Sequence, residues 1–308
     1  MGRQSADDFL TCVMKRSEND LIIRVGALIL LFVVVPILAI IIAADINWFY
    51  NEYIRNPSET VEFPKFIVDH IDDFAGAHLM EYTIGTFILF IIIRSLKNHA
   101  RRDIEWMSAL TDYAESYGHD VSALRVIMGR VNLEKTLKLA WGFYIWFLAV
   151  LICCICQALF ISLDNLEVHT AVMTINVLIF EMVIQVCFTS FYIQWKIRKL
   201  DRIQCDFTKV FCWMMKGDFV ILMPMPPSMK PHKLKRHLVA IALTLGSYST
   251  FYLLWSVEVM NKHIRRQWTY EEYLLGKIIK QEGATGAEGY REDIDMLHRI
   301  ARVLHKDG

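Results

Sequence analysis

Five apolar stretches, each about as long as a membrane-spanning helix, alternate with polar segments along this chain. The hydrocarbon core of a bilayer is about 30 Å thick and an α-helix rises about 1.5 Å per residue, so a spanning helix needs about 20 residues. The first stretch, Val25 to Ala44, meets this length and contains no charged residue. The other four are Leu79 to Leu96, Leu139 to Leu163, Thr170 to Trp195 and Leu238 to Val257.

This pattern predicts an all-α fold, a polytopic transmembrane helical bundle with cytoplasmic helical extensions. The composition agrees, because 55% of the 308 residues are hydrophobic and a soluble domain would need a very large core to bury them. The 33 basic and 33 acidic residues give no net attraction to nucleic acid, so membrane lipids are the expected partners. The seven cysteines imply neither a disulfide framework nor a metal site, since they lie in apolar stretches or on the predicted cytoplasmic side.

The distribution of basic residues predicts the orientation of the bundle. The segments 97–138 and 196–236 are rich in Lys and Arg, whereas the segments before the second stretch and between the third and fourth are acidic. Basic loops stay in the cytoplasm, so we expect a multi-pass protein of the plasma membrane with a cytoplasmic N-terminus. A fifth span would place Lys262, Arg265 and Arg266 outside, which conflicts with the same rule. The side of the C-terminal tail is therefore left open.

The chain divides into four predicted regions. Residues 1–200 form the four-span region, in which residues 97–137 make a cytoplasmic helical hairpin that turns at Gly118. Residues 201–236 form an interfacial helix and a Pro-rich linker. The fifth membrane helix occupies 237–260 and is the most polar, so it is either spanning or interfacial. Residues 261–308 form an amphipathic helical tail, whose apolar face needs the rest of the protein, a second copy or another protein to cover it.

Two parts of the chain share a pattern. His99-x-Arg101-Arg102 follows the second stretch, and His263-x-Arg265-Arg266 follows the fifth. Aromatic residues at the ends of the fourth and fifth stretches also repeat, since Phe191-Tyr192-x-x-Trp195 matches Phe251-Tyr252-x-x-Trp255. Repeated helix ends indicate duplicated units, which membrane proteins often pack about a pseudo-symmetry axis.

The segment 244–261 carries a recognisable string. It has Thr244, Gly246 and Tyr248, then Tyr252 and Trp255, and it closes with Asn261. This string resembles the T-x-G-x-Y…Y-x-x-W…N signature of a small prokaryotic membrane domain of unknown function, built from paired transmembrane helices. The resemblance implies that the fifth stretch is embedded in the membrane, and it implies no activity.

The fourth stretch contains a polar stripe. Glu181 lies near its middle, where an ionised carboxylate costs about 2.5 to 3.5 kcal/mol on insertion scales. Gln185 and Thr174 fall on the same helical face and Asn176 lies nearby. This stripe predicts an ion or proton path, or a buried ligand contact. The competing interpretation is that Glu181 bonds to a polar group on a neighbouring helix, such as Gln157 or Ser247, and holds the helices together.

The basic clusters and the acidic segment suggest two further sites. His99, Arg101, Arg102, His263, Arg265 and Arg266 are candidates for contact with lipid phosphate, although ordinary topology determinants have the same composition. His78 and Glu81 lie one helical turn apart, and Asp72 or Asp73 lies within reach of the same cation. Acidic segments are usually only solvated, so no metal site is assigned. No catalytic or nucleotide-binding motif is present, and we expect neither an enzyme nor a cofactor.

The sequence therefore predicts a membrane scaffold or interaction protein, a homo-oligomer or the anchor of a membrane or cytoplasmic partner. The alternative is a small channel or transporter with a polar path around Glu181.

Overall fold

The computed structural model describes residues 2–16, 20–29, 63–162, 168–219, 222–227, 234–244 and 248–283, and the regular secondary structure of these ranges is entirely helical. The all-α prediction is confirmed. The elements are α1 (Gly2–Met14), α3 (Val25–Ile29), α5 (Phe63–Ser116), α6 (Ser122–Gly129), α7 (Leu133–Ser162), α8 (Val168–Met214), the short 3₁₀ helix η2 (Met215–Gly217), α9 (Leu234–Leu243) and α10 (Tyr248–Gly283).

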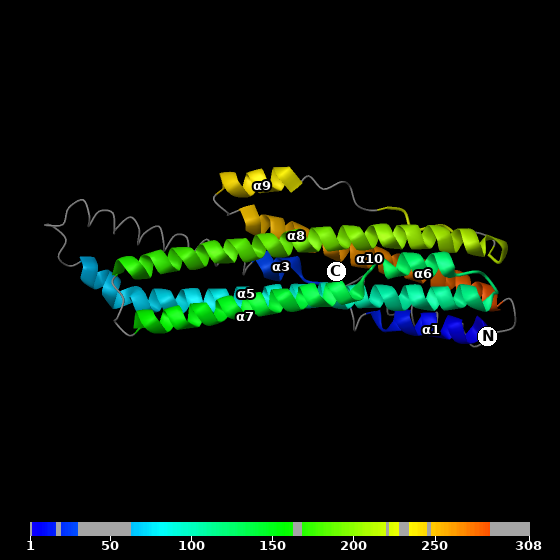
Figure 1. The fold of residues 1–308 in the computed structure, drawn as a ribbon, viewed down its shortest axis with the longest axis horizontal. Helices are drawn as coiled ribbons and strands as arrows, with labels where there is room; N and C mark the ends of the chain where they lie inside the picture. Colours follow the sequence, from blue (N-terminus) through cyan, green and yellow to red (C-terminus); the bar gives the residue numbers. More distant parts are fainter. Residues whose placement is uncertain are drawn as a thin grey trace.

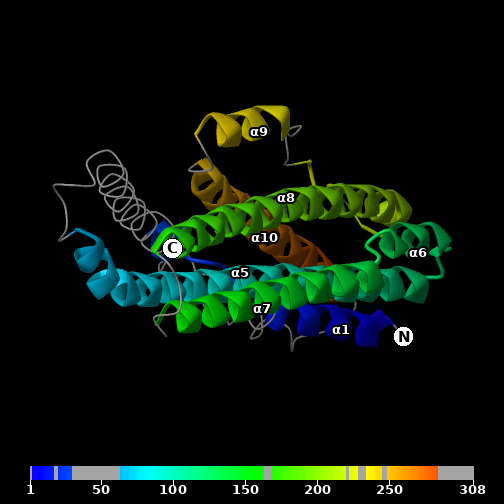
Figure 2. The same ribbon diagram turned by 60° about the vertical axis from the view of Figure 1, so that its left-hand side comes forward.

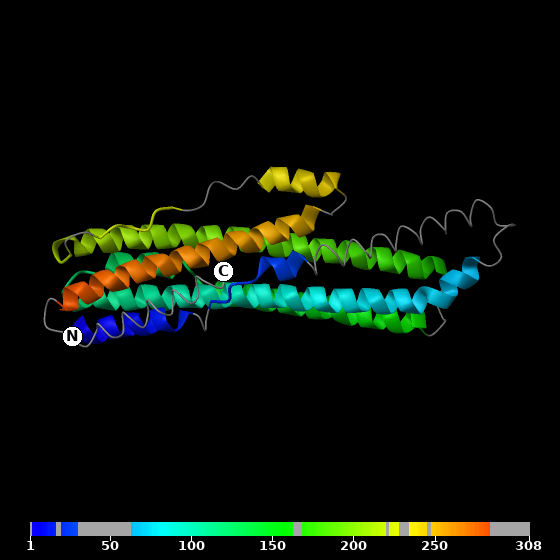
Figure 3. The ribbon, with the colours of Figure 1, turned by 180° about the vertical axis from the view of Figure 1, so that it is seen from behind.

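The helices form an elongated bundle, and α5 and α8 run side by side along its length (Figures 1 and 3). Helix α7 packs on the first part of α5, and α10 packs on the second part of α8. Helix α5 has 54 residues and α8 has 47, which at about 1.5 Å per residue makes them about 80 and 70 Å long. Each is more than twice the length of about 20 residues that a membrane-spanning helix needs.

The bundle has two hydrophobic cores, one in each half. The apolar half comprises residues 79–96 of α5, 139–162 of α7 and 168–195 of α8, and its core includes Leu89, Phe147 and Ile193. Residues 253–264 of α10 also pack into this core. The polar half comprises α1, α6, the later parts of α5 and α8, and α10 from Tyr270. Its core includes Phe9 and Trp106. Each half is thus packed internally, and the long helices join the two.

The surfaces of the two halves differ. Large apolar side chains are exposed along the apolar half, whereas the polar half buries most of its own. The exposed ones in the apolar half are Met80, Phe87, Leu139, Trp141, Ile145, Leu148, Ile152, Ile155, Leu159, Val177, Phe180, Phe188 and Trp195. Contiguous apolar surface of this kind marks a region that is covered by a membrane or another protein.

One helix in the described part of the chain is long and apolar enough to cross a membrane by length and composition. It lies within Ser122–Leu159, and 17% of its most apolar window is buried inside the protein. A core helix of a soluble protein would be mostly buried, which this one is not. One helix does not make a polytopic bundle, so that part of the fold prediction stays a prediction.

The structure divides the predicted regions differently from the hydropathy pattern. Helix α5 runs without a break from Phe63 to Ser116, through the second stretch and into the predicted hairpin. Gly118 has a φ of +85° and turns the chain toward α6, as its position in the hairpin predicts. Residues 206–214, predicted as part of an interfacial helix, continue α8. Of the first stretch only Val25–Ile29 is described, and residues 284–308 of the tail lie outside the described ranges.

The fifth stretch is divided between two helices. Helix α9 ends at Leu243 and α10 begins at Tyr248, and α9 lies on the outside of the bundle beside α8 and the start of α10 (Figure 2). The His237 ring of α9 stacks on Tyr252 and Trp255 of α10, with centroids 4.6 and 5.1 Å apart. Residues 261–283, predicted to begin a separate tail, belong to α10.

Candidate functional site

The two repeated His-x-Arg-Arg clusters meet in the interior of the bundle, just beyond the apolar half. The rings of His99 on α5 and His263 on α10 lie edge to face, with centroids 5.3 Å apart. Both histidines are buried, and so is Arg102 one turn after His99. Arg266 occupies the equivalent position after His263. The repeat seen in the sequence thus becomes a contact between two helices.

Arg102 holds two buried carboxylates from different parts of the chain. Its guanidinium donates to Asp20, in the extended segment before α3, and to Glu271 on α10. His99 Nδ1 lies 2.9 Å from Asp20 Oδ1, and Trp268 Nε1 donates to Asp20 Oδ2 over 2.8 Å. These bonds connect α5, α10 and the N-terminal segment through charged groups that water does not reach.

The surroundings of Asp20 determine its charge. Burial by itself raises the pKa of this carboxyl, but the neighbouring His99, Arg102 and Trp268 favour the ionised form and lower the pKa to about 2. For Glu271 the balance is opposite, since complete burial raises its pKa despite the attraction of Arg102. Asp20 is therefore the firmly ionised partner in this network.

A second set of polar contacts extends the cluster to α8. Gln204 Nε2 donates to Asp103 Oδ1 over 2.8 Å and to Gln267 Oε1 over 3.0 Å. Arg266 donates to Asp201 Oδ1 over 3.1 Å, and His263 Nδ1 lies 3.5 Å from the same oxygen. Helices α5, α8 and α10 are therefore joined around one buried centre.

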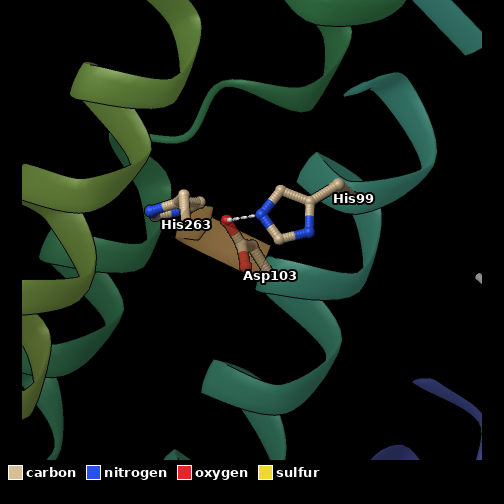
Figure 4. Close-up of side chains that lie close together, drawn as sticks. All are labelled: His99, Asp103 and His263. Carbon is tan, nitrogen blue, oxygen red and sulfur yellow. Dashed lines mark ion pairs between the residues drawn. The ribbon is translucent and has the colours of Figure 1, made fainter. Parts of the chain in front are cut away.

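Several buried polar atoms of this cluster have no hydrogen-bond partner among the described residues, including His99 Nε2, Asp103 Oδ2, Gln204 Oε1 and both ring nitrogens of His263. Figure 4 shows the His99, Asp103 and His263 side chains converging on one small volume between α5 and α10. Buried polar groups are nearly always paired, so a group of unpaired ones needs an explanation.

The polar stripe of the fourth stretch is in part described. Glu181 Oε1 accepts a hydrogen bond of 3.0 Å from Trp146 Nε1 on α7. This contact joins two helices, as in the helix-packing interpretation, although the partner is neither Gln157 nor Ser247. Gln185 is buried, and neither atom of its amide is paired within the described part of the chain. Thr174 and Asn176 lie on α8, but their side chains are outside the described set.

The residues proposed for lipid phosphate fall into two groups. His99, Arg102 and His263 are buried and contact protein groups, which corrects the prediction for these three, because a buried side chain cannot reach a lipid head group. Arg101 and Arg265 are exposed, so their contact with lipid phosphate stays a prediction. Arg266 is half-buried and bonds to Asp201.

The acidic segment lies on the backbone of α5, before the apolar half. The side chains of His78, Glu81, Asp72 and Asp73 fall outside the described set, so the structure adds nothing on a cation site there.

The carboxylates and amides of the buried cluster were not found from the sequence. They lie in segments where charged residues are common and usually solvated. These residues are Asp20, Asp103, Asp201, Gln204 and Glu271. One signal was available, because His99 and Asp103 are spaced i, i+4 and therefore share a helical face.

The fold and the cluster define a helical protein whose exposed apolar half continues into a polar half built around buried ion pairs. No protein-family model, curated protein or solved structure matches the chain.

Proposed function

We propose that this chain is a multi-pass protein of the plasma membrane that works as a scaffold, with its apolar half in the bilayer and its polar half in the cytoplasm. The exposed apolar surface of α5, α7 and α8 is the observation that carries this proposal. In a bilayer, lipid tails cover that surface at no cost, whereas in water it would drive aggregation.

The junction between the halves has the composition of a membrane interface. Lys97 lies over the Tyr144 ring at 5.8 Å, and Lys199 lies over the Trp195 ring at 5.9 Å. Trp141 is exposed at the same end of α7. Aromatic rings and long basic side chains favour the head-group region, so this belt supports a boundary at about residues 97, 141 and 195.

The contacts of α10 support a cytoplasmic tail. Gln194 near the end of the fourth stretch bonds to Ser256 over 3.2 Å, and His99 contacts His263 beyond the junction. Helix α10 therefore leaves the core of the apolar half after Ile264 and runs along the polar half from Tyr270 onward, beside basic segments that we assign to the cytoplasm. On this arrangement the fifth stretch enters the interface through α9 and the start of α10 and does not span.

A reporter fused after Gly308 tests this topology. We expect a cytoplasmic signal from a green fluorescent protein fusion and no activity from an alkaline phosphatase fusion, which folds only outside. The same two reporters placed between residues 45 and 62 should give the opposite result. An active phosphatase after Gly308 would contradict the proposal.

The scaffold role follows from the continuity of the long helices. Helices α5 and α8 pass from one half to the other without interruption, and the buried cluster fixes α10 to both. The polar half is therefore rigidly connected to the apolar half, and its end farthest from the apolar half keeps a fixed position relative to the membrane. That end exposes Trp213 to 78% and Met223 to 63%, which gives a second copy or a cytoplasmic protein apolar side chains to contact.

One observation favours the alternative, a small channel or transporter. Tyr82, Thr86, Gln185 and Thr189 are buried in the apolar half with side-chain atoms that are unpaired within the described ranges. Polar groups inside a membrane bundle are often part of an ion path.

Flux through liposomes separates the two functions. For a scaffold we expect the purified protein to carry no protons, cations or anions above empty liposomes, and Glu181→Gln to keep the elution volume and unfolding midpoint of the unaltered protein within about 2 °C. The matched control is Glu134→Gln, whose carboxylate is exposed. Protein-dependent flux that Glu181→Gln abolishes and Glu134→Gln preserves would replace the scaffold with the transporter.

A further inference from the structure

We propose that His99, Asp103 and His263 bind one divalent transition-metal ion at the centre of the buried cluster. One potential ligand atom from each residue lies within 4.8 Å of the others, and all three residues are buried. His99 and Asp103 come from successive turns of α5, and His263 comes from α10, which packs against it (Figure 4). This site is additional to the scaffold function, which requires no bound ion.

The hydrogen bonds around His99 and Asp103 leave one potential metal-ligand atom of each residue free. His99 Nδ1 is held by Asp20 over 2.9 Å, which turns Nε2 toward the centre. Asp103 Oδ1 accepts from Gln204 over 2.8 Å and from Trp106 over 3.3 Å, which leaves Oδ2. Neither Nε2 of His99 nor Oδ2 of Asp103 has a hydrogen-bond partner in the described structure. A carboxylate behind a ligating histidine is the usual outer-shell arrangement of metal sites.

His263 is less firmly held. Its Nδ1 lies 3.5 Å from Asp201 Oδ1, and neither ring nitrogen has a hydrogen-bond partner within the described ranges. Each histidine thus has an aspartate beside it, hydrogen-bonded for His99 and at ion-pair distance for His263. The repeated His-x-Arg-Arg pattern therefore contributes one ligand from each copy.

Acidic groups outnumber guanidinium groups in the cluster. Four buried carboxylates, from Asp20, Asp103, Asp201 and Glu271, lie around the two guanidinium groups of Arg102 and Arg266. A divalent ion between His99, Asp103 and His263 places positive charge beside these carboxylates. It also pairs the three unpaired ligand atoms.

The ligand set selects the class of metal. Two imidazole nitrogens and one carboxylate oxygen suit Zn²⁺ or another first-row transition ion, whereas Mg²⁺ and Ca²⁺ take oxygen ligands. Ligand atoms around tetrahedral Zn²⁺ lie about 3.3 Å apart. His99 Nε2 and Asp103 Oδ2 are 3.9 Å apart, so small side-chain rotations bring the set to bonding distance. The unpaired Oε1 of Gln204, or water, is available for the remaining position.

The metal content of the purified protein is the direct test. Protein bearing a tag without histidine, extracted in detergent, should contain about one transition-metal ion per chain by mass spectrometry of the elements. After treatment with EDTA, equimolar Zn²⁺ should raise the unfolding midpoint by several degrees, because an ion that binds the folded state stabilises it, and Mg²⁺ should not. Co²⁺ should give visible absorption bands of a site with nitrogen and oxygen ligands.

Variants assign the site. Asn at position 103 keeps a carbonyl oxygen for the bonds from Gln204 and Trp106, so Asp103→Asn should fold and weaken Zn²⁺ binding by at least about tenfold. His263→Gln should do the same. The control is His119→Ala, whose ring pairs with Asp218 at the far end of the bundle. Metal-free protein with no response to Zn²⁺ or Co²⁺ would overturn the proposal, and so would Zn²⁺ binding that both site variants retain in full. Neither result bears on membrane topology or on flux.

Discussion

Replacing Arg102 by Met is expected to lower the free energy of unfolding by about 3 to 5 kcal/mol, the range for removing one partner of a buried ion pair. Arg102 is 1% exposed and donates to both Asp20 and Glu271. Methionine fills much of the same volume but leaves two carboxylates buried without their cation. The loss of charge pairing, more than a loss of packing, therefore sets the size of the effect.

The neighbouring arginine provides the control. Arg101 has the same chemistry and the same helix, but its side chain is exposed, so Arg101→Met should change the free energy of unfolding by no more than about 0.5 kcal/mol. Thermal unfolding in detergent, followed by circular dichroism, should show a midpoint for Arg102→Met on the order of 10 °C lower. Combining Arg102→Met with Glu271→Gln should recover part of the loss, since one carboxylate is then neutral. Equal midpoints for the Arg101 and Arg102 variants would contradict the account of the cluster.

Replacing Lys196 by Met is expected to stabilise the protein at pH 7 by about 1 to 3 kcal/mol. Lys196 is 2% exposed, and its burial, with the nearby charge of Lys199, lowers its pKa from 10.5 to about 8. Its ammonium group bonds to Thr136 Oγ1 over 2.5 Å, and no carboxylate accepts from it in the described structure. The attraction of Asp103 only partly offsets the cost of burying this cation, which an apolar side chain of similar length avoids.

The pH dependence gives this prediction its sign. Between about pH 8 and 10.5 the unfolded chain keeps the Lys196 proton while the folded chain has lost it, so folding is favoured as the pH rises. The advantage of Lys196→Met should therefore be largest below pH 8 and shrink toward pH 10.5. Unfolding midpoints of both proteins at pH 7 and pH 10 measure this difference. The control is Lys209→Met, which makes the same substitution at an exposed lysine of the same helix. A gap between Lys196→Met and the unaltered protein that is constant with pH would show that the ammonium is not the cause.

The sequence predicted the helices of the apolar half because hydropathy and length are local properties. The third stretch lies in α7 as far as Ser162, the fourth, Thr170 to Trp195, lies within α8, and Gly118 turns the chain where the pattern stops. The ends of these helices were not predictable, because a helix can continue without a break from an apolar stretch into a polar one. Helix α8 therefore continues to Met214 through residues that the composition assigned to an interface.

The repeated His-x-Arg-Arg clusters were visible in the sequence, but their surroundings were not. An exposed arginine that meets lipid phosphate and a buried one that meets Asp20 and Glu271 have the same local sequence. Which of the two applies depends on α10 packing against α5 and α8, and on the segment around Asp20 lying beside both. These contacts join residues separated by 63 to 248 positions, and no local periodicity encodes them.

By itself, the sequence determined the helical class, the apolar stretches and the segregation of basic and acidic segments, because each depends on residue type and spacing along the chain. The tertiary structure alone decided that two repeats meet and that their histidines and one arginine are buried. It also decided which polar atoms are left unpaired at the centre. Burial and pairing are properties of several segments at once, so they exist only after the long helices have packed.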